Sequence, residues 1–138
     1  MKFDLIILID DDGPTNFLHQ LMIEEAEAAD NLMVCNNVVD AEAEIEKQQQ
    51  SAQDQNSVIF LDINLPRFTG FELIERNQEH FKTLKSKGFK VILLSTSQNP
   101  VDIEKAKNYP TIDLFWEKPI DGEKLEKLRS MYLVESNG

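Results

Sequence analysis

Five short apolar runs, separated by longer segments of helical character, constrain the fold of this chain more than any other feature of its sequence. The runs are Leu5 to Ile9, Leu32 to Val39, Val58 to Leu61, Val91 to Leu94 and Ile112 to Trp116. The first, third and fourth runs lack the polar alternation of a half-exposed strand, as strands covered on both faces do. Strands that alternate with helices in this way predict an α/β fold, with a parallel sheet and helices on both of its faces.

The segments between the runs carry the signals of helices. In the first segment, apolar residues recur at helical spacing and are expected to be core residues, namely Phe17, Leu18, Leu21 and Met22. We expect Asp40 to be the N-cap of a second helix over 41–50. An apolar stripe that continues through the next segment, which Gly88 closes, predicts a third helical region: Phe71, Ile74, Phe81 and Leu84. Weaker stripes predict the remaining helices near 101–106 and 125–132.

Size, charge and cysteine content exclude several classes of protein. The 138 residues fit one domain, and the net charge of -11 argues against binding to nucleic acid or to an anionic membrane. No apolar stretch approaches the roughly 20 residues of a membrane span, and the N-terminus lacks the pattern of a signal peptide. The single cysteine, Cys35, cannot form an internal disulfide, which suits a reducing compartment, so we expect a cytoplasmic protein.

Polar and charged residues stand where the predicted strands end. Asp10 to Asp12 follow the first run, Asp62 follows the third, Ser95 ends the fourth, and Lys118 follows the fifth. In an open parallel α/β sheet, ligands bind outside the carboxyl ends of the strands. Carboxylates that meet there repel one another, at a cost of about 4 kcal/mol for two charges ~4 Å apart at an effective dielectric constant near 20.

A divalent cation removes that repulsion. Mg²⁺ prefers a few carboxylates together with water and phosphate oxygens, and it would also neutralise a phosphoryl group placed on one of the acids. Asp62 would then be a carboxylate nucleophile at the end of a rigid strand. The Ser95 hydroxyl and the Lys118 ammonium would complete the contacts to the phosphate.

Four motifs, in this order along the chain, resemble those of a response-regulator receiver domain of two-component signalling. They are "LIDDD", "FLDINLPRFTGFEL", "VILLSTS" and "FWEKPI", and the resemblance covers essentially the whole length. It implies a flavodoxin-like (βα)5 fold, with a five-stranded parallel sheet of order 2-1-3-4-5. It also implies one receiver domain over 1–138, with no effector domain, and therefore a stand-alone response regulator that is a phospho-acceptor and not an enzyme.

The resemblance also implies a role for each matching residue. Asp62 would accept a phosphoryl group from a sensor histidine kinase or a histidine phosphotransfer protein, in a reaction that depends on Mg²⁺. Asp11 would bind the metal directly, Asp10 mostly through water, and Asn64 through its backbone carbonyl, with Asp62 as a further ligand. Lys118 would pair with Asp62 before phosphorylation and with the phosphoryl oxygens afterwards.

Further matches concern the switch and the loops. Ser95 would be the switch hydroxyl and Phe115 the switch aromatic residue, so that phosphorylation changes a surface that binds a downstream protein, which the sequence does not name. Pro66 and Gly70 would shape the loop after Asp62, and Pro119 would follow a cis bond. The chain departs from the family where Thr96 replaces a smaller residue and where "NYPTID" replaces a glycine-containing turn.

Other interpretations of the same residues remain open. Asp12 fits a metal ligand or a helix N-terminal charge. A phosphohydrolase with an aspartyl-phosphate intermediate needs an acid two residues after the nucleophile, where this chain has Asn64. A receiver-like binding module that is never phosphorylated would not need the intact set of acids. His19 and His80 lie in helical segments and are expected to be exposed or hydrogen-bonded, not phosphotransfer sites.

Overall fold

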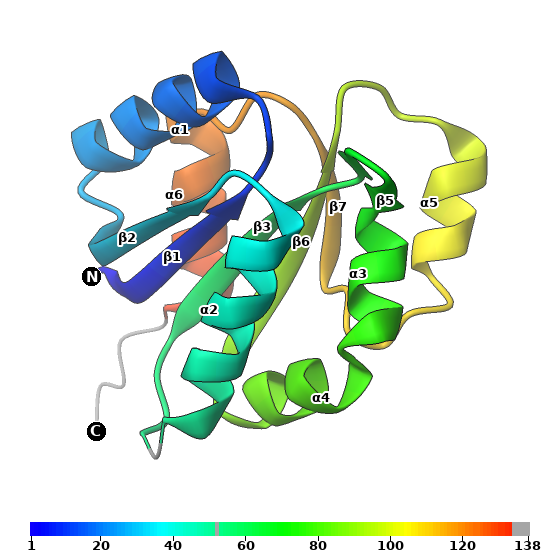
Figure 1. Cartoon of the computed structure of the whole chain (residues 1–138). Coiled ribbons are helices and arrows are strands. Elements are labelled where there is room, and N and C mark those ends of the chain that lie inside the picture. The colour runs from blue at the N-terminus through cyan, green and yellow to red at the C-terminus, as the bar shows by residue number, and fades with distance from the viewer. Residues whose placement is uncertain (52, 134–138) are drawn as a thin grey trace.

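A five-stranded parallel sheet runs through the centre of the protein. The computed structural model of the chain describes residues 1–51 and 53–133. The strands are β1 (Phe3–Ile9), β2 (Ala29–Cys35), β3 (Ser57–Asp62), β6 (Phe89–Ser95) and β7 (Leu114–Glu117), in the spatial order β2-β1-β3-β6-β7 (Figure 1). Every neighbouring pair is parallel. The five apolar runs therefore form the sheet that the sequence predicts.

The strand order confirms the predicted 2-1-3-4-5 topology. The labels β6 and β7 belong to the fourth and fifth strands of the main sheet, because a separate two-stranded hairpin intervenes, formed by β4 (Asn64–Leu65) and β5 (Phe68–Thr69). In this order β3 lies between β1 and β6, so the carboxyl ends of those three strands are neighbours. Asp62 is the register partner of Leu94, one residue before Ser95.

Helices cover both faces of the sheet, as predicted. One face carries α1 (Gly13–Glu25) and α6 (Gly122–Tyr132), and the other carries α2 (Val38–Gln50), α3 (Gly70–Arg76), α4 (Gln78–Ser86) and α5 (Pro100–Ala106) (Figure 1). All six residues of β3 are buried, which explains why that run shows no polar alternation. Among the described residues, none of the helices is long and apolar enough to cross a membrane.

The buried side of α1 is not the one that the apolar spacing predicts. The expected core residues Phe17, Leu18 and Leu21 are 65%, 41% and 39% exposed, and Met22 is only partly buried. The helix instead buries Asn16, His19 and Ile23. The prediction was wrong because it used apolar periodicity alone. Asn16 and His19 can be buried because both are hydrogen-bonded inside the protein, and apolar periodicity does not reveal such partners.

The second strand ends earlier than predicted, and the second helix begins earlier. β2 stops at Cys35, while Val38 and Val39 lie in the first turn of α2. Asn37 is the N-cap, since its side-chain oxygen accepts a hydrogen bond from the backbone N–H of Asp40 at 2.7 Å. The prediction that Asp40 caps this helix is therefore wrong, because the helix begins at Val38 and the capping side chain is that of Asn37, three residues upstream.

The third helical region consists of two helices that meet at Asn77. The side-chain nitrogen of Asn77 donates to the carbonyl oxygen of Leu73 at 2.9 Å and to a carboxylate oxygen of Glu42, in α2, at 2.8 Å. The predicted stripe is nevertheless fully buried: Phe71, Ile74, Phe81 and Leu84. Gly88, with a φ of 104°, follows α4 in the left-handed conformation that suits glycine.

Candidate functional site

Four polar or charged side chains lie together at the carboxyl edge of the sheet. Asp10 follows β1, Asp62 ends β3, Ser95 ends β6 and Lys118 follows β7. Asp10, Asp62 and Ser95 are each at most 5% exposed, and the side chain of Lys118 is 12% exposed. The topology thus brings these four residues to one place, as the strand ends in the sequence predict.

Asp11 joins Asp10 and Asp62 in a compact group of acids. One carboxylate oxygen from each lies within 4.8 Å of the others, and Asp11 is exposed while the other two are buried. Three hard oxygen donors, one of them open to solvent, suit a cation such as Mg²⁺, which keeps several waters and takes only a few protein ligands. The chemistry and spacing of the donors therefore fit the predicted metal.

Lys118 balances part of this negative charge. Its Nζ donates to Asp10 Oδ2 at 2.6 Å and lies 3.3 Å from Asp62 Oδ1. The expected pair with Asp62 is present, but the shorter contact is with Asp10. The bond between Lys118 and Pro119 is cis, as the family resemblance implies.

The buried environment shifts the pKa values of two of these groups. Burial, helped by the negative charge of Asp10, raises the pKa of Asp62 to about 6, although the Asn64 N–H and Lys118 act in the opposite direction. Burial alone would lower the pKa of Lys118, but its hydrogen bond to Asp10 and the charges of both carboxylates raise it. Lys118 therefore remains an ammonium, and Asp62 is largely ionised at neutral pH.

The two carboxylate oxygens of Asp62 differ in their surroundings. Oδ1 accepts the backbone N–H of Asn64 at 3.2 Å and also faces Lys118. Within the described residues Oδ2 makes no hydrogen bond, and the Asp62 side chain as a whole is 7% exposed. Asp62 thus has one oxygen that two neighbours contact and one oxygen with no hydrogen-bond partner among the described residues.

Gly70 lets the loop after Asp62 fold back onto its strand. Its N–H donates to the carbonyl oxygen of Ile63 at 2.8 Å. A Cβ at this position would lie 2.9 Å from the carbonyl oxygen of Asp62 and 2.9 Å from Cδ1 of Leu93, so only glycine fits without displacement. Pro66 is exposed in the turn between β4 and β5, beside an arginine with a φ of 67°.

The predicted switch residues lie on neighbouring strands. The buried Ser95 hydroxyl accepts the N–H of Ser97 at 3.2 Å. Phe115, the register partner of Leu93, is partly buried and packs against the core that β3 and β6 share with α2 to α5. Thr96, next to Ser95, is exposed. These positions agree with the resemblance, while the switching roles of Ser95 and Phe115 stay predictions.

Asp12 has a structural task of its own. It is the N-cap of α1, and its carboxylate accepts hydrogen bonds from the backbone N–H and the hydroxyl of Thr15, which lower its pKa. Of the two open interpretations, this geometry favours the helix cap.

Cys35 is a buried thiol, and burial is the main reason why its pKa is raised to about 11. A thiol with a raised pKa is unreactive, which agrees with a packing role.

Two residues of α1 contact the main chain of this site, although the sequence analysis did not place them there. Asn16 donates to the carbonyl oxygen of Asp10, and His19 accepts the N–H of Ile120, two residues after Lys118. The expectation that His19 is hydrogen-bonded is thus confirmed. Two polar residues three positions apart, among the apolar residues of a helix, were the signal that could have identified them.

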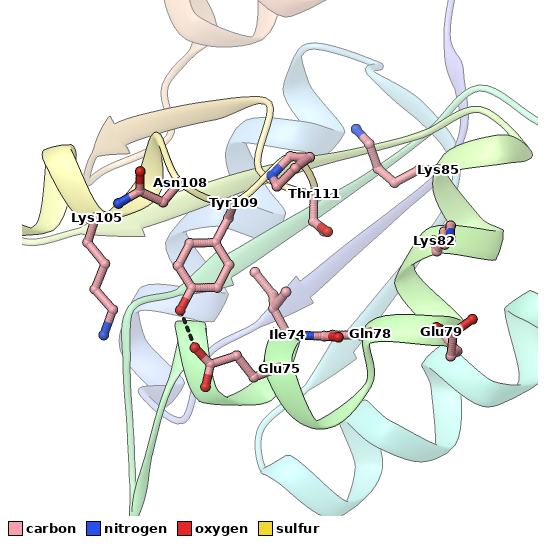
Figure 2. Close-up of a pocket in the computed structure, with 11 residues that line it drawn as sticks. Ile74, Glu75, Gln78, Glu79, Lys82, Lys85, Lys105, Asn108, Tyr109 and Thr111 are labelled. Atoms are coloured by element: carbon pink, nitrogen blue, oxygen red, sulfur yellow. Dashed lines mark hydrogen bonds between the residues drawn. The ribbon is translucent and has the colours of Figure 1, made fainter.

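A groove of about 880 Å³ lies elsewhere, between α3, α4 and the segment that joins α5 to β7. Figure 2 shows Tyr109, from the "NYPTID" segment, pointing toward Glu75 of α3, to which its hydroxyl donates a hydrogen bond. The Tyr109 ring also packs on Phe71, with the ring centres 5.1 Å apart. The groove shares no residue with the acidic site. Through these two contacts, Tyr109 packs the "NYPTID" segment against α3.

Comparisons with known proteins agree on one family. The family model described as the response regulator receiver domain matches residues 6–129. A solved two-component response regulator from Cytophaga hutchinsonii is 30% identical, with a TM-score of 0.85, and the match covers 98% of this chain and all of that one. No curated protein sequence matches the chain significantly.

More distant solved structures share the fold. A response regulator receiver protein from Dyadobacter fermentans is 20% identical, with a TM-score of 0.80 over 95% of this chain and 98% of that one. The chemotaxis response regulator CheY4 of Vibrio cholerae is 22% identical, with a TM-score of 0.68 over 95% of this chain and 99% of that one.

Proposed function

The chain belongs to the response regulator receiver family, and from that premise we propose that Asp62 is its phosphoryl acceptor. Receiver domains are phospho-acceptor domains of two-component signalling, and they interact with histidine kinases or phosphotransfer proteins. One observation carries the assignment to Asp62. Its carboxylate lies beside those of Asp10 and Asp11, and Lys118 and the Asn64 N–H contact one of its oxygens while the other makes no hydrogen bond within the described residues.

The transfer is a substitution at phosphorus. At neutral pH Asp62 is mostly ionised, because its pKa of about 6 lies below that pH. Its oxygen Oδ2 attacks the phosphorus of a phosphohistidine on the kinase or phosphotransfer protein. The new oxygen–phosphorus bond forms as the phosphorus–nitrogen bond breaks, and a neutral imidazole leaves with the electron pair of that bond, its other ring nitrogen keeping the ring proton.

The surrounding charges favour this step. A magnesium ion held by Asp10, Asp11, Asp62 and the backbone carbonyl of Asn64 would neutralise negative charge on the phosphoryl oxygens. Lys118 keeps its proton and exchanges its contact with Asp62 for one with a phosphoryl oxygen. The Ser95 hydroxyl donates a hydrogen bond to a second oxygen.

The signal then leaves the site through the adjoining strands. To reach the phosphoryl group, Ser95 gives up the hydrogen bond that its hydroxyl accepts from Ser97. Phe115, on the next strand, moves with it. The surface formed by α5, β7 and α6 changes its conformation, and a downstream protein binds the changed surface.

The proposal is tested by incubating the protein with acetyl phosphate, with and without Mg²⁺, and measuring the intact mass. We expect the mass of one phosphoryl group to be added only when Mg²⁺ is present. The Asp62→Asn variant should gain nothing, whereas Asp12→Asn, which removes a neighbouring charge but retains a capping side chain, should be modified like the wild type. Phosphate uptake by Asp62→Asn would refute the assignment.

A further inference from the structure

The buried side of α1 carries two polar residues one helical turn apart. Asn16 is 4% exposed and His19 is 1% exposed, and residues three positions apart lie on the same side of a helix. Burying a polar group costs free energy unless it is hydrogen-bonded. The partners of these two side chains therefore indicate what this side of the helix does.

Each side chain holds a main-chain group next to the acidic site. Asn16 Nδ2 donates to the carbonyl oxygen of Asp10 at 2.8 Å, and His19 Nε2 accepts the N–H of Ile120 at 3.0 Å. Asp10 is the first residue after β1, and Ile120 follows Lys118 by two positions. The helix therefore connects the two segments that carry the ion pair between Lys118 and Asp10.

His19 has the protonation state that this contact needs. To accept a hydrogen bond at Nε2, the imidazole must be neutral and carry its proton on Nδ1. Burial lowers the pKa of His19 to about 4, so the ring is neutral at physiological pH. Its partner is well placed, since Pro119 has no N–H and Ile120 offers the first amide proton after Lys118 itself.

The main chain around Lys118 is held at successive positions. The N–H of Lys118 donates to the carbonyl oxygen of Ser95 at 2.7 Å. Nζ of Lys124 donates to the carbonyl oxygens of Glu117 and Pro119 at 2.6 and 2.7 Å. His19 adds the contact that ties this loop to α1. Because the backbone is held in place, only the side-chain torsions of Lys118 can still move its ammonium group away from Asp10.

We propose that Asn16 and His19 are positioning residues that set the geometry of the ion pair between Asp10 and Lys118. They act through the backbone, with Asn16 holding the end of β1 and His19 holding the loop after β7. Because a displacement of about 1 Å at a reacting group can cost as much as 100-fold in rate, this support makes phosphoryl transfer faster. That last consequence rests on the proposed function, whereas the positioning of Lys118 does not.

Three variants separate positioning from ordinary packing. His19→Leu removes the Nε2 acceptor and places an apolar side chain of similar size in the same space. His19→Gln restores an acceptor, because the glutamine side-chain oxygen can reach the N–H of Ile120. Ile23→Val alters the third buried residue of the same side, which makes no side-chain hydrogen bond. All three variants first have to unfold cooperatively in urea.

Two measurements follow, the first without phosphate or metal. In His19→Leu we expect amide hydrogen exchange at Ile120 to accelerate about ten-fold or more and the ε-methylene resonance of Lys118 to shift toward that of an exposed lysine. The second measurement is the rate of phosphorylation by acetyl phosphate with Mg²⁺, which should fall about ten-fold in the same variant. His19→Gln should restore both signals, and Ile23→Val should leave both near the wild type.

Unchanged Lys118 signals in His19→Leu would overturn the proposal, as would a His19→Gln protein as impaired as His19→Leu. If His19→Leu does not fold, Asn16→Leu breaks the other link and is judged by the same Lys118 resonance and the same rate. A wild-type protein that takes up no phosphoryl group would contradict the proposed function instead. The resonance measurement in the unphosphorylated protein would still decide whether these residues position Lys118.

Discussion

Nζ of Lys118 lies 2.6 Å from Oδ2 of Asp10, which joins two residues 108 positions apart in the chain. The side chains are 12% and 5% exposed, so this ion pair is largely shielded from water. The same ammonium lies 3.3 Å from Asp62 Oδ1. One positive charge thus serves two buried carboxylates, and with the nearby Asp11 the site retains an excess of negative charge.

Replacing Lys118 by methionine should therefore destabilise the protein. The substitution removes the ammonium but keeps a long apolar side chain, and it leaves Asp10 and Asp62 without their cation. We expect the free energy of unfolding to fall by about 3–5 kcal/mol in EDTA, as when one partner of a buried ion pair is lost. Urea unfolding measures the change, and Mg²⁺ should restore part of it. A Lys118→Met protein as stable as the wild type would contradict this account of the charges.

Magnesium should stabilise the wild-type protein against unfolding. At a concentration 100 times its Kd, a ligand that binds only the folded state adds about 2.7 kcal/mol. Asp11→Asn should lose most of this gain, because it removes one of the three carboxylates that lie within 4.8 Å of one another. Asp12→Asn is the matched control and should keep the gain, since asparagine also caps a helix. Equal gains in the two variants, measured by urea unfolding, would argue against the assigned metal ligands.

Asp62→Asn should stabilise the metal-free protein at neutral pH. The pKa of Asp62 is about 6 in the folded protein against an ordinary value of 3.8, so the folded state holds this proton more tightly than the unfolded state does. Ionising Asp62 therefore lowers stability as the pH rises from about 4 to 6, and the cost is fully present above pH 6. After allowance for solvent screening, we expect a gain of about 1 kcal/mol at pH 7.

The pH dependence checks this interpretation. Well below pH 3.8 Asp62 is protonated in both the folded and the unfolded states, so the advantage of Asp62→Asn should disappear there. Urea unfolding in EDTA at several pH values gives the comparison. If the variant were less stable than the wild type at pH 7, the ionised Asp62 would be a net stabilising group, and the expected cost of ionising it in the folded protein would be disproved.

The sequence was sufficient for the sheet and for the edge that carries the site. A run such as Val58 to Leu61 has to be buried, and the alternation of strands and helices makes the sheet parallel. Once the order of those strands is given, the residues after them meet at one edge, which is why their positions in the sequence predict that Asp10, Asp62 and Lys118 lie together, as they do.

Hydrogen bonds of polar side chains account for the features that the sequence did not predict correctly. On α1, the partners of Asn16 and His19 lie far away in the chain, so apolar spacing alone turned the wrong side inward. The first turn of α2 depends on the cap that Asn37 provides, and the break between α3 and α4 on contacts of Asn77 with two helices. The contact of His19 with Ile120 becomes visible only when distant segments are placed together, whereas the Asn37 cap joins residues only three positions apart in the chain.

Substituting alanine at Gly70 should disturb the loop next to Asp62. The added methyl group would meet the Asp62 carbonyl oxygen and Leu93 at 2.9 Å, and overpacking of this kind costs about 1–3 kcal/mol. Gly13→Ala is a matched control, because both glycines are the first residue of a helix and nothing lies within 4 Å of a Cβ at Gly13. Thermal unfolding should separate the two variants, and a loss as large in Gly13→Ala would mean that the contact at Gly70 is not responsible.

The central claim is that Asp62, and no neighbouring acid, carries the phosphoryl group, and chemical mapping of the attachment site tests it most directly. The protein is treated with acetyl phosphate and Mg²⁺ and then reduced with borohydride, which converts an aspartyl phosphate into homoserine. Peptide mass spectrometry then locates the converted residue. We expect homoserine at position 62 and nowhere else. Conversion at Asp10 or Asp11, or an unconverted position 62 in a protein that has gained a phosphoryl group, would contradict the account.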